Sequence, residues 1–173
     1  QLMETDSKNS QYYLSYKRFL RNSGNQEKIL DIALNFYKHN PKDPSAHFEW
    51  VNALIMNQDE NWEMEANIFI DNNYADKILM RQILFSMYSA GFSHQLNSFS
   101  KKMRELTKDD SFLARELGDI YLMRMDYPSG INEYLLFLKQ NPHDFKYISD
   151  KVMSLPEDEY VVNIVRSELQ KKS

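Results

Sequence analysis

Several features that mark whole classes of protein are missing from this sequence of 173 residues. It has no cysteine, which excludes a disulfide framework and a thiolate metal site. Only four Gly and five Pro interrupt it, as is typical of a helical protein. No apolar run approaches the roughly eighteen residues that a membrane-spanning helix needs. The absences favour a soluble α-helical chain without a membrane span.

The chain also lacks a run of basic residues. Nucleic-acid binding normally requires a basic face that displaces counterions, and the net charge here is −4. We therefore expect no nucleic-acid partner. A chain without cysteine suits the cytosol and the periplasm equally, so the compartment stays open between a cytoplasmic and an exported protein. The first residue is Gln1, which leaves a fragment of a longer protein or a mature form after signal cleavage as alternatives.

The residue patterns that carry catalysis are missing too. The sequence has no His-Glu-x-x-His pair for zinc, no Gly-x-Ser-x-Gly elbow and no glycine-rich phosphate loop. Acidic clusters at 59–65 and 157–159 fall at expected helix starts, where carboxylates interact favourably with the helix dipole. We expect a protein that is not an enzyme and that holds neither a cofactor nor a metal ion. The four histidines are scattered: His39, His47, His94 and His143.

Aromatic residues, by contrast, are abundant. Eleven Tyr, ten Phe and two Trp are more than a disordered chain would carry, because their burial offsets chain entropy. Apolar spacing and breakers predict an all-α fold, and no alternating run indicates a strand. The predicted helices are ten, near 7–22, 26–39, 44–57, 60–72, 75–90, 93–107, 111–125, 128–140, 144–154 and 157–171.

The most informative motif lies at 111–144. Its residues follow the pattern W-x2-L-G-x2-Y…A-x3-F…P of a helix–turn–helix repeat, with substitutions at three places. The matching positions are Ala114, Leu117, Gly118, Tyr121, Gly130, Tyr134 and Pro142. This segment resembles one tetratricopeptide repeat (TPR). In that pattern the glycine allows close helix packing, and we expect Tyr121, Tyr134 and Phe137 to join adjacent helices.

A second signal supports a repeat. Asn-Pro-x-Asp occurs at 40–43 and again at 141–144, an offset of 101 residues, one short of three periods of about 34. The resemblance implies an antiparallel helical-hairpin solenoid, a right-handed TPR-like superhelix forming a single domain over 1–173. The best repeat is 111–144. The weaker units are 7–43, 44–76 and 77–110, followed by closing helices over 144–171.

The resemblance also implies a binding groove lined by the first helix of each hairpin. Two arginines at equivalent positions, Arg81 and Arg115, would bind a carboxylate of the partner beside aromatic side chains. The alternative is that they pair with acidic residues of this chain, such as Glu116 or Asp119. The set departs from that of chaperone-tail-binding members of the family, because Phe85 and Asp119 stand where an Asn is required. The predicted groove residues are Ile78, Arg81, Phe85, Tyr88, Phe112, Arg115, Asp119, Leu122 and Met123.

The leading hypothesis is a non-enzymatic protein–protein interaction module that takes a peptide or helix of a protein partner in this groove. One alternative is a structural spacer, a segment of a longer solenoid that binds or self-associates through its terminal helices. Another is an enzyme or RNA binder built on helical repeats. RNA recognition is disfavoured because it requires polar pairs, stacking aromatics and a basic face.

Overall fold

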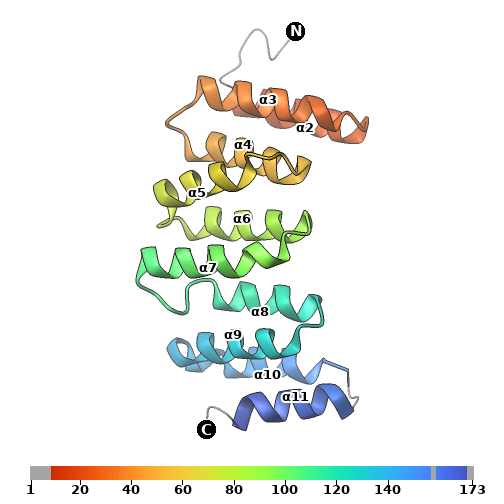
Figure 1. Cartoon of the computed structure of the whole chain (residues 1–173), viewed down its shortest axis with the longest axis vertical. Coiled ribbons are helices and arrows are strands. Elements are labelled where there is room, and N and C mark those ends of the chain that lie inside the picture. The colour runs from red at the N-terminus through yellow and green to blue at the C-terminus, as the bar shows by residue number, and fades with distance from the viewer. Residues whose placement is uncertain (1–8, 157–158, 171–173) are drawn as a thin grey trace. The chain divides into compact units, whose positions relative to one another are not determined.

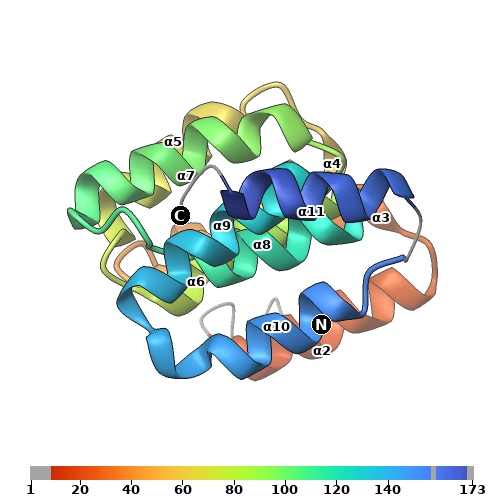
Figure 2. The ribbon, with the colours of Figure 1, turned by 90° about the horizontal axis from the view of Figure 1, so that it is seen from below.

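The computed structural model describes residues 9–156 and 159–170, and their regular structure is helical throughout (Figure 1, Figure 2). Within these residues there are ten α-helices, one short 3-10 helix and no strand, which confirms the predicted all-α class. The elements are α2 (Ser10–Asn22), α3 (Gln26–His39), α4 (Pro44–Asn57), α5 (Trp62–Asn73), α6 (Lys77–Ser89), α7 (Ser93–Thr107), α8 (Ala114–Met123), α9 (Tyr127–Gln140), η1 (Pro142–Asp144), α10 (Phe145–Met153) and α11 (Glu159–Gln170).

The predicted helix bounds agree closely with the observed ones. The helices predicted over 26–39, 44–57 and 93–107 have the bounds of α3, α4 and α7. The largest internal difference is at α8, which begins only at Ala114 because residues 110–113 form turns. Positions 7, 8, 157, 158 and 171 of the predicted terminal helices lie outside the described residues.

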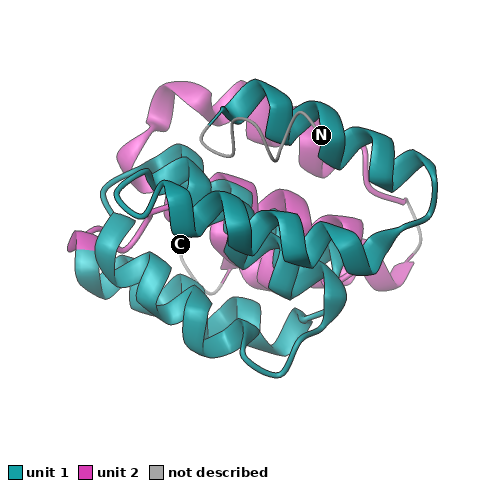
Figure 3. Ribbon diagram, turned by 90° about the horizontal axis from the view of Figure 1, so that it is seen from above, with its two compact units in different colours: residues 1–106 teal, residues 107–173 magenta. Residues whose placement is uncertain are grey.

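The chain divides into two compact units (Figure 3). Unit 1 comprises residues 1–106 and unit 2 comprises residues 107–173. The single domain over 1–173 stays a prediction. The boundary falls at the end of α7. The helices α2 to α6 and all of α7 except Thr107 therefore belong to unit 1, and α8 to α11 belong to unit 2. The predicted groove residues are therefore shared between two units.

One backbone feature recurs in the turn that follows α2, α4, α6 and α8. A residue in the left-handed region stands there each time: Gly24 (φ 73°), Gln58 (φ 53°), Gly91 (φ 86°) and Met125 (φ 60°). Glycine adopts this conformation without a Cβ penalty, while a residue with a side chain incurs about 1–2 kcal/mol of strain. These positions are 33 or 34 residues apart, the interval that the sequence motif predicts.

The starts of the first helices recur at the same interval. Asn9, Asp43 and Asp76 cap α2, α4 and α6, and each side chain accepts a bond of 2.9–3.0 Å from the backbone N–H two residues on. Asp109 accepts the same bond from Ser111 at 2.9 Å, before the turn that leads into α8. Such a cap satisfies a backbone N–H that has no partner inside the helix. The pairs α2/α3, α4/α5, α6/α7 and α8/α9 thus share one local pattern.

Aromatic rings join the helices of unit 1. Tyr13 of α2 stacks on Phe36 of α3 with 4.5 Å between ring centroids, and Trp62 of α5 stacks on Phe92 at 4.2 Å. Tyr13 and Phe36 are almost fully buried. Burying one such ring stabilises the fold by roughly 1.5–3 kcal/mol. Part of the aromatic abundance of the sequence is therefore used for packing between helices.

Two glycines allow α8 and α9 to approach closely in unit 2. A Cβ atom on Gly118 would lie 2.4 Å from Cε1 of Tyr134, whose side chain is 1% exposed. Gly130 of α9 lies against Leu122 of α8 in the same way. A Cβ atom on Gly130 would lie 2.6 Å from Cδ2 of Leu122. The close packing predicted for Gly118 and the joining role predicted for Tyr134 are thus observed. Val161 of α11 is buried in a cluster with Tyr127 and Ile131 of α9.

Candidate functional site

The predicted groove residues of unit 1 lie on α6, on the side that faces away from its buried residues. Ile78 is 64% exposed and Arg81 is exposed, while Phe85 and Tyr88 are half-buried. The spacing of Ile78, Arg81 and Phe85 places them on one face of the helix. The guanidinium group of Arg81 forms no hydrogen bond or ion pair within the described residues, so the alternative in which it pairs with an acid of its own array is not observed there.

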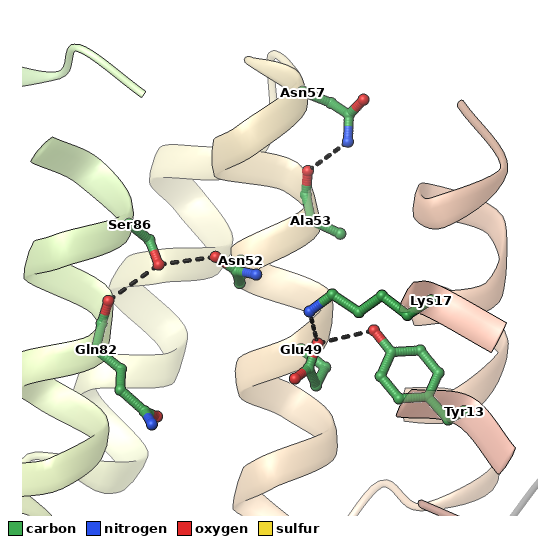
Figure 4. Close-up of polar contacts among 8 residues, drawn as sticks. All are labelled: Tyr13, Lys17, Glu49, Asn52, Ala53, Asn57, Gln82 and Ser86. Atoms are coloured by element: carbon green, nitrogen blue, oxygen red, sulfur yellow. Dashed lines mark hydrogen bonds and ion pairs between the residues drawn. The ribbon is translucent and has the colours of Figure 1, made fainter. Parts of the chain in front are cut away.

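A polar contact fixes α6 beside α4 (Figure 4). The Ser86 hydroxyl lies 2.7 Å from Oδ1 of Asn52 and 2.9 Å from the backbone oxygen of Gln82. Asn52 and Ser86 are 34 residues apart, so equivalent helices of successive pairs are in contact. Because Ser86 is buried and Asn52 half-buried, the contact aligns the two helices while Asn52 stays partly open to solvent.

A second polar contact fixes α2 beside α4 (Figure 4). The Glu49 carboxylate accepts a hydrogen bond from the Tyr13 hydroxyl at 2.8 Å and forms an ion pair with Lys17. The Lys17 and Glu49 side chains are only 12% and 15% exposed, so both charges are largely withdrawn from solvent. Burial and the neighbouring Glu49 carboxylate raise the pKa of Tyr13 far above its ordinary value, which keeps the phenol protonated as the donor.

The predicted groove residues of unit 2 are placed less uniformly. Met123 is 55% exposed and Leu122 half-buried on α8, but Phe112 lies in the turn before the helix and is only 8% exposed. The Arg115 guanidinium lies 3.3 Å from the carboxylate of the buried Glu116, which is one of the pairings considered from the sequence. Asp119 is half-buried. Met123 is therefore the predicted residue of this unit that offers open surface, because Arg115 is paired and Leu122 packs against the cluster of Tyr127, Ile131 and Val161.

Asp119 contacts side chains of two other helices of unit 2. Its Oδ1 accepts a hydrogen bond from the Tyr134 hydroxyl at 2.7 Å and lies 3.3 Å from the ammonium nitrogen of Lys151 on α10. Burial, and then the bond to Asp119, raise the pKa of Tyr134 well above its ordinary range. Asp119 in turn raises the pKa of Lys151. The carboxylate joins α8, α9 and α10, so its contacts are made within unit 2.

Sequence reasoning missed the residues that align the first helices, namely Glu49, Asn52 and Ser86. It also missed the exposed arginines of α2, Arg18 and Arg21. The sequence does contain a signal for these residues in the regular spacing of four Asn or Asp residues. Aligning the chain on these four residues brings the first helices of the pairs into register. The four residues are Asn9, Asp43, Asp76 and Asp109, of which the first three cap α2, α4 and α6.

Comparisons of the chain with protein-family models, with curated proteins and with solved structures give no match. Within residues 9–156 and 159–170 no three His, Cys, Asp or Glu side chains are grouped so that they could hold a metal ion. None of the described helices is long and apolar enough to cross a membrane. The function is therefore inferred from the surfaces of the helices.

Proposed function

We propose that the chain is a non-enzymatic protein–protein interaction module of TPR-like helical-hairpin architecture, which binds a peptide or helix of a protein partner along its first helices. The observation that carries the proposal is the exposed face of α6. There, Ile78 and the unpaired Arg81 stand beside the half-buried Phe85. A mixed surface of apolar, aromatic and arginine side chains is the composition of binding hot spots.

The regular construction of the pairs supports the same proposal. The turns at Gly24, Gln58, Gly91 and Met125 and the Asx caps recur at 33 or 34 residues, the period of TPR hairpins. Repeated hairpins whose first helices lie side by side create an extended surface for a partner. In unit 1 the contact between Asn52 and Ser86 holds two of these helices adjacent.

A second function, that of a spacer in a longer solenoid, has its own supporting observation in unit 2. An apolar cavity of about 620 Å³ opens between α10 and α11. Of its lining residues Met153 (77%) and Val162 (41%) remain exposed, and Tyr160 of α11 is also exposed (69%). An open apolar end of this kind is a place where a further helical element or a second molecule would pack.

Affinity capture with two matched variants tests the leading function. The binding-face variant is Ile78→Ser/Arg81→Ser on α6. The control is Met64→Ser/Ile68→Ser on α5, where both side chains are also exposed, at 56% and 43%. All four side chains are exposed, so we expect both variants to keep the helicity of the unaltered chain.

The expected result is a partner that is captured by the unaltered chain and by the α5 variant but lost with the α6 variant. Equal capture by all three proteins would contradict binding at α6. If a Met153→Ser/Tyr160→Ser variant alone lost the partner or a self-association, the spacer function would be favoured instead.

A further inference from the structure

The first helices of unit 1 have a charge opposite to that of the whole chain. The helices α2, α4 and α6 contain a single acidic residue, Glu49. Its carboxylate is neutralised by Lys17 and by the Tyr13 hydroxyl. The same helices contain five Lys or Arg residues, although the chain carries a net charge of −4: Lys17, Arg18, Arg21, Lys77 and Arg81. By contrast, α5 has three acids and no Lys or Arg.

Three of these cations point away from the core without an acidic partner. Arg18, Arg21 and Arg81 are exposed, and none of the three forms an ion pair or hydrogen bond through its guanidinium within the described residues. Surface cations that function only in solubility are usually mixed with acids. Here the exposed faces of α2 and α6 have no acid of their own, so the positive potential is not cancelled locally.

The Asx caps show that these residues share one side of their helices. Leu14 and Arg81 each lie five residues after their cap, and Arg18 and Phe85 each lie nine residues after it. Asn52 of α4 also lies nine residues after its cap, between them in sequence. Residues at the same distance from equivalent helix starts have the same helical phase.

The contacts of α4 place the three helices side by side, with α2 joined through Glu49 and α6 joined through Asn52 (Figure 4). Apolar side chains accompany the arginines on this face. Leu14 is 49% exposed and Ile78 is 64% exposed. We name the surface formed by Leu14, Arg18, Arg21, Asn52, Ile78, Arg81 and Phe85 the α2–α4–α6 face.

We propose that the α2–α4–α6 face binds an acidic peptide segment that also presents apolar side chains. The inference rests on the proposed function and names the chemistry of its partner. Asp or Glu side chains of the segment accept hydrogen bonds from Arg18, Arg21 and Arg81, because a guanidinium group can bind a carboxylate through two parallel N–H donors. Its apolar side chains cover Leu14, Ile78 and the half-buried Phe85.

A protein segment fits this face better than a nucleic acid. The cations are three isolated arginines beside exposed aliphatic side chains, and phosphate binding does not desolvate Leu14 or Ile78. The negative charge of the whole chain also opposes a polyanion of high charge density. A short acidic segment engages the local positive potential without approaching the acidic remainder of the chain closely.

Selection of peptides from a random display library on the full chain, followed by titration of the enriched peptides, tests the proposal. The binding variant is Arg18→Gln/Arg21→Gln/Arg81→Gln. The control is Lys28→Gln/Lys38→Gln/Lys42→Gln, which removes the same charge from exposed side chains on and just after α3. Circular dichroism establishes that both variants keep the helicity of the unaltered chain.

The proposal predicts enriched peptides that are acidic and contain apolar residues. It also predicts that the arginine variant raises their Kd about 10- to 100-fold, as expected for three exposed charge contacts, and that the lysine variant leaves Kd within about threefold. Raising the salt concentration from about 0.05 to about 0.5 M should weaken binding of the unaltered chain more than that of the arginine variant.

Four outcomes would overturn the proposal. Enriched peptides that are neutral or basic, or an arginine variant that binds as tightly as the control, would overturn the acidic partner while leaving peptide binding, and so the proposed function, in place. Displacement of the peptides by a short single-stranded oligonucleotide at equal concentration would assign the face to nucleic acid. Failure of any peptide to bind the unaltered chain would overturn both the partner class and the proposed function.

Discussion

At the scale of single residues, the stability of unit 2 depends on a position where no side chain fits. Gly118 lies against the ring of Tyr134, and that ring is held by the bond from its hydroxyl to Asp119 at 2.7 Å. Gly130 lies against Leu122, whose Cδ2 and Cγ atoms would be 2.6 and 2.9 Å from an added Cβ atom, and the backbone oxygen of Gly118 would be 3.3 Å from it. An anchored ring cannot move aside, whereas the Leu122 side chain can change its χ1 rotamer.

We therefore expect Gly118→Ala to destabilise the chain by about 1–3 kcal/mol, the usual cost of overpacking, reduced by up to about 1 kcal/mol because Ala favours the helix. Gly130→Ala is the matched comparison and should cost less, because the Leu122 side chain, unlike the Tyr134 ring, is not fixed by a hydrogen bond. Urea unfolding of the two variants measures the difference. Equal losses, or a stabilised Gly118→Ala, would show that Tyr134 is not held in place.

A second residue couples stability to pH. His47 is 6% exposed, its ring stacks on Tyr37 at 4.6 Å and meets Phe69 edge-on at 5.1 Å, and Nε2 has no hydrogen-bond partner. The nearest carboxylate is Glu65 on α5, 3.8 Å from Nε2. Burial lowers the pKa of His47 below its ordinary value of 6.5. The unfolded chain consequently binds the proton more tightly than the folded one.

Neutral His47 therefore makes its full contribution to the free energy of unfolding above about pH 6.5. That contribution decreases as the pH falls below this value. The variant His47→Phe preserves a ring between Tyr37 and Phe69 but cannot titrate. We expect the unfolding free energy of the unaltered chain to fall more steeply than that of His47→Phe between about pH 6.5 and pH 5. Parallel curves, obtained by urea unfolding, would mean that Glu65 compensates the burial.

At the scale of helices, α2 is held by its charged contact with α4 as well as by packing. Replacing Glu49 with Ala leaves Lys17 and the Tyr13 hydroxyl without their acceptor in a largely buried place. Breaking such a pair costs about 3–5 kcal/mol when it is fully buried, and less here because the side chains keep 12–15% exposure.

Hydrogen exchange of Glu49→Ala should show lost protection in 10–22, with a smaller change in 77–89. The matched control is Glu105→Ala, which removes an exposed i,i+4 pair with Lys101 and should cost under about 1 kcal/mol. If the two variants exchanged alike in α2, the contact with Glu49 would not hold the helix.

The helices themselves were predictable, because each is written locally in the sequence. Asn40-Pro41 ends α3 and Pro44 begins α4, so both bounds follow from local rules. The start of α8 was not predictable. Leu113, just before it, adopts the left-handed conformation with φ 57°, and a leucine in a sequence gives no indication of that conformation. The pairings of the candidate site were equally hidden: nothing local indicates that Asp119 binds Tyr134 and Lys151 rather than solvent.

At the scale of the whole molecule, the distribution of charge distinguishes one surface from the rest. The net charge of −4 predicts nothing about where cations lie, and only the alignment of helices on their caps brings Arg18 and Arg81 to one side of unit 1. The sequence pairs Arg81 with Arg115 by a period of 34. In the structure Arg115 contacts Glu116, which leaves Arg81 as the available member of that pair.

The most direct test of the account is hydrogen exchange of the unaltered chain with and without a bound partner or an enriched acidic peptide. The account predicts added protection in 10–22, 44–57 and 77–89, the helices of the α2–α4–α6 face, and little change in 62–73. Protection confined to α10 and α11 would contradict it. The apolar end of unit 2 would then be the surface that the molecule uses.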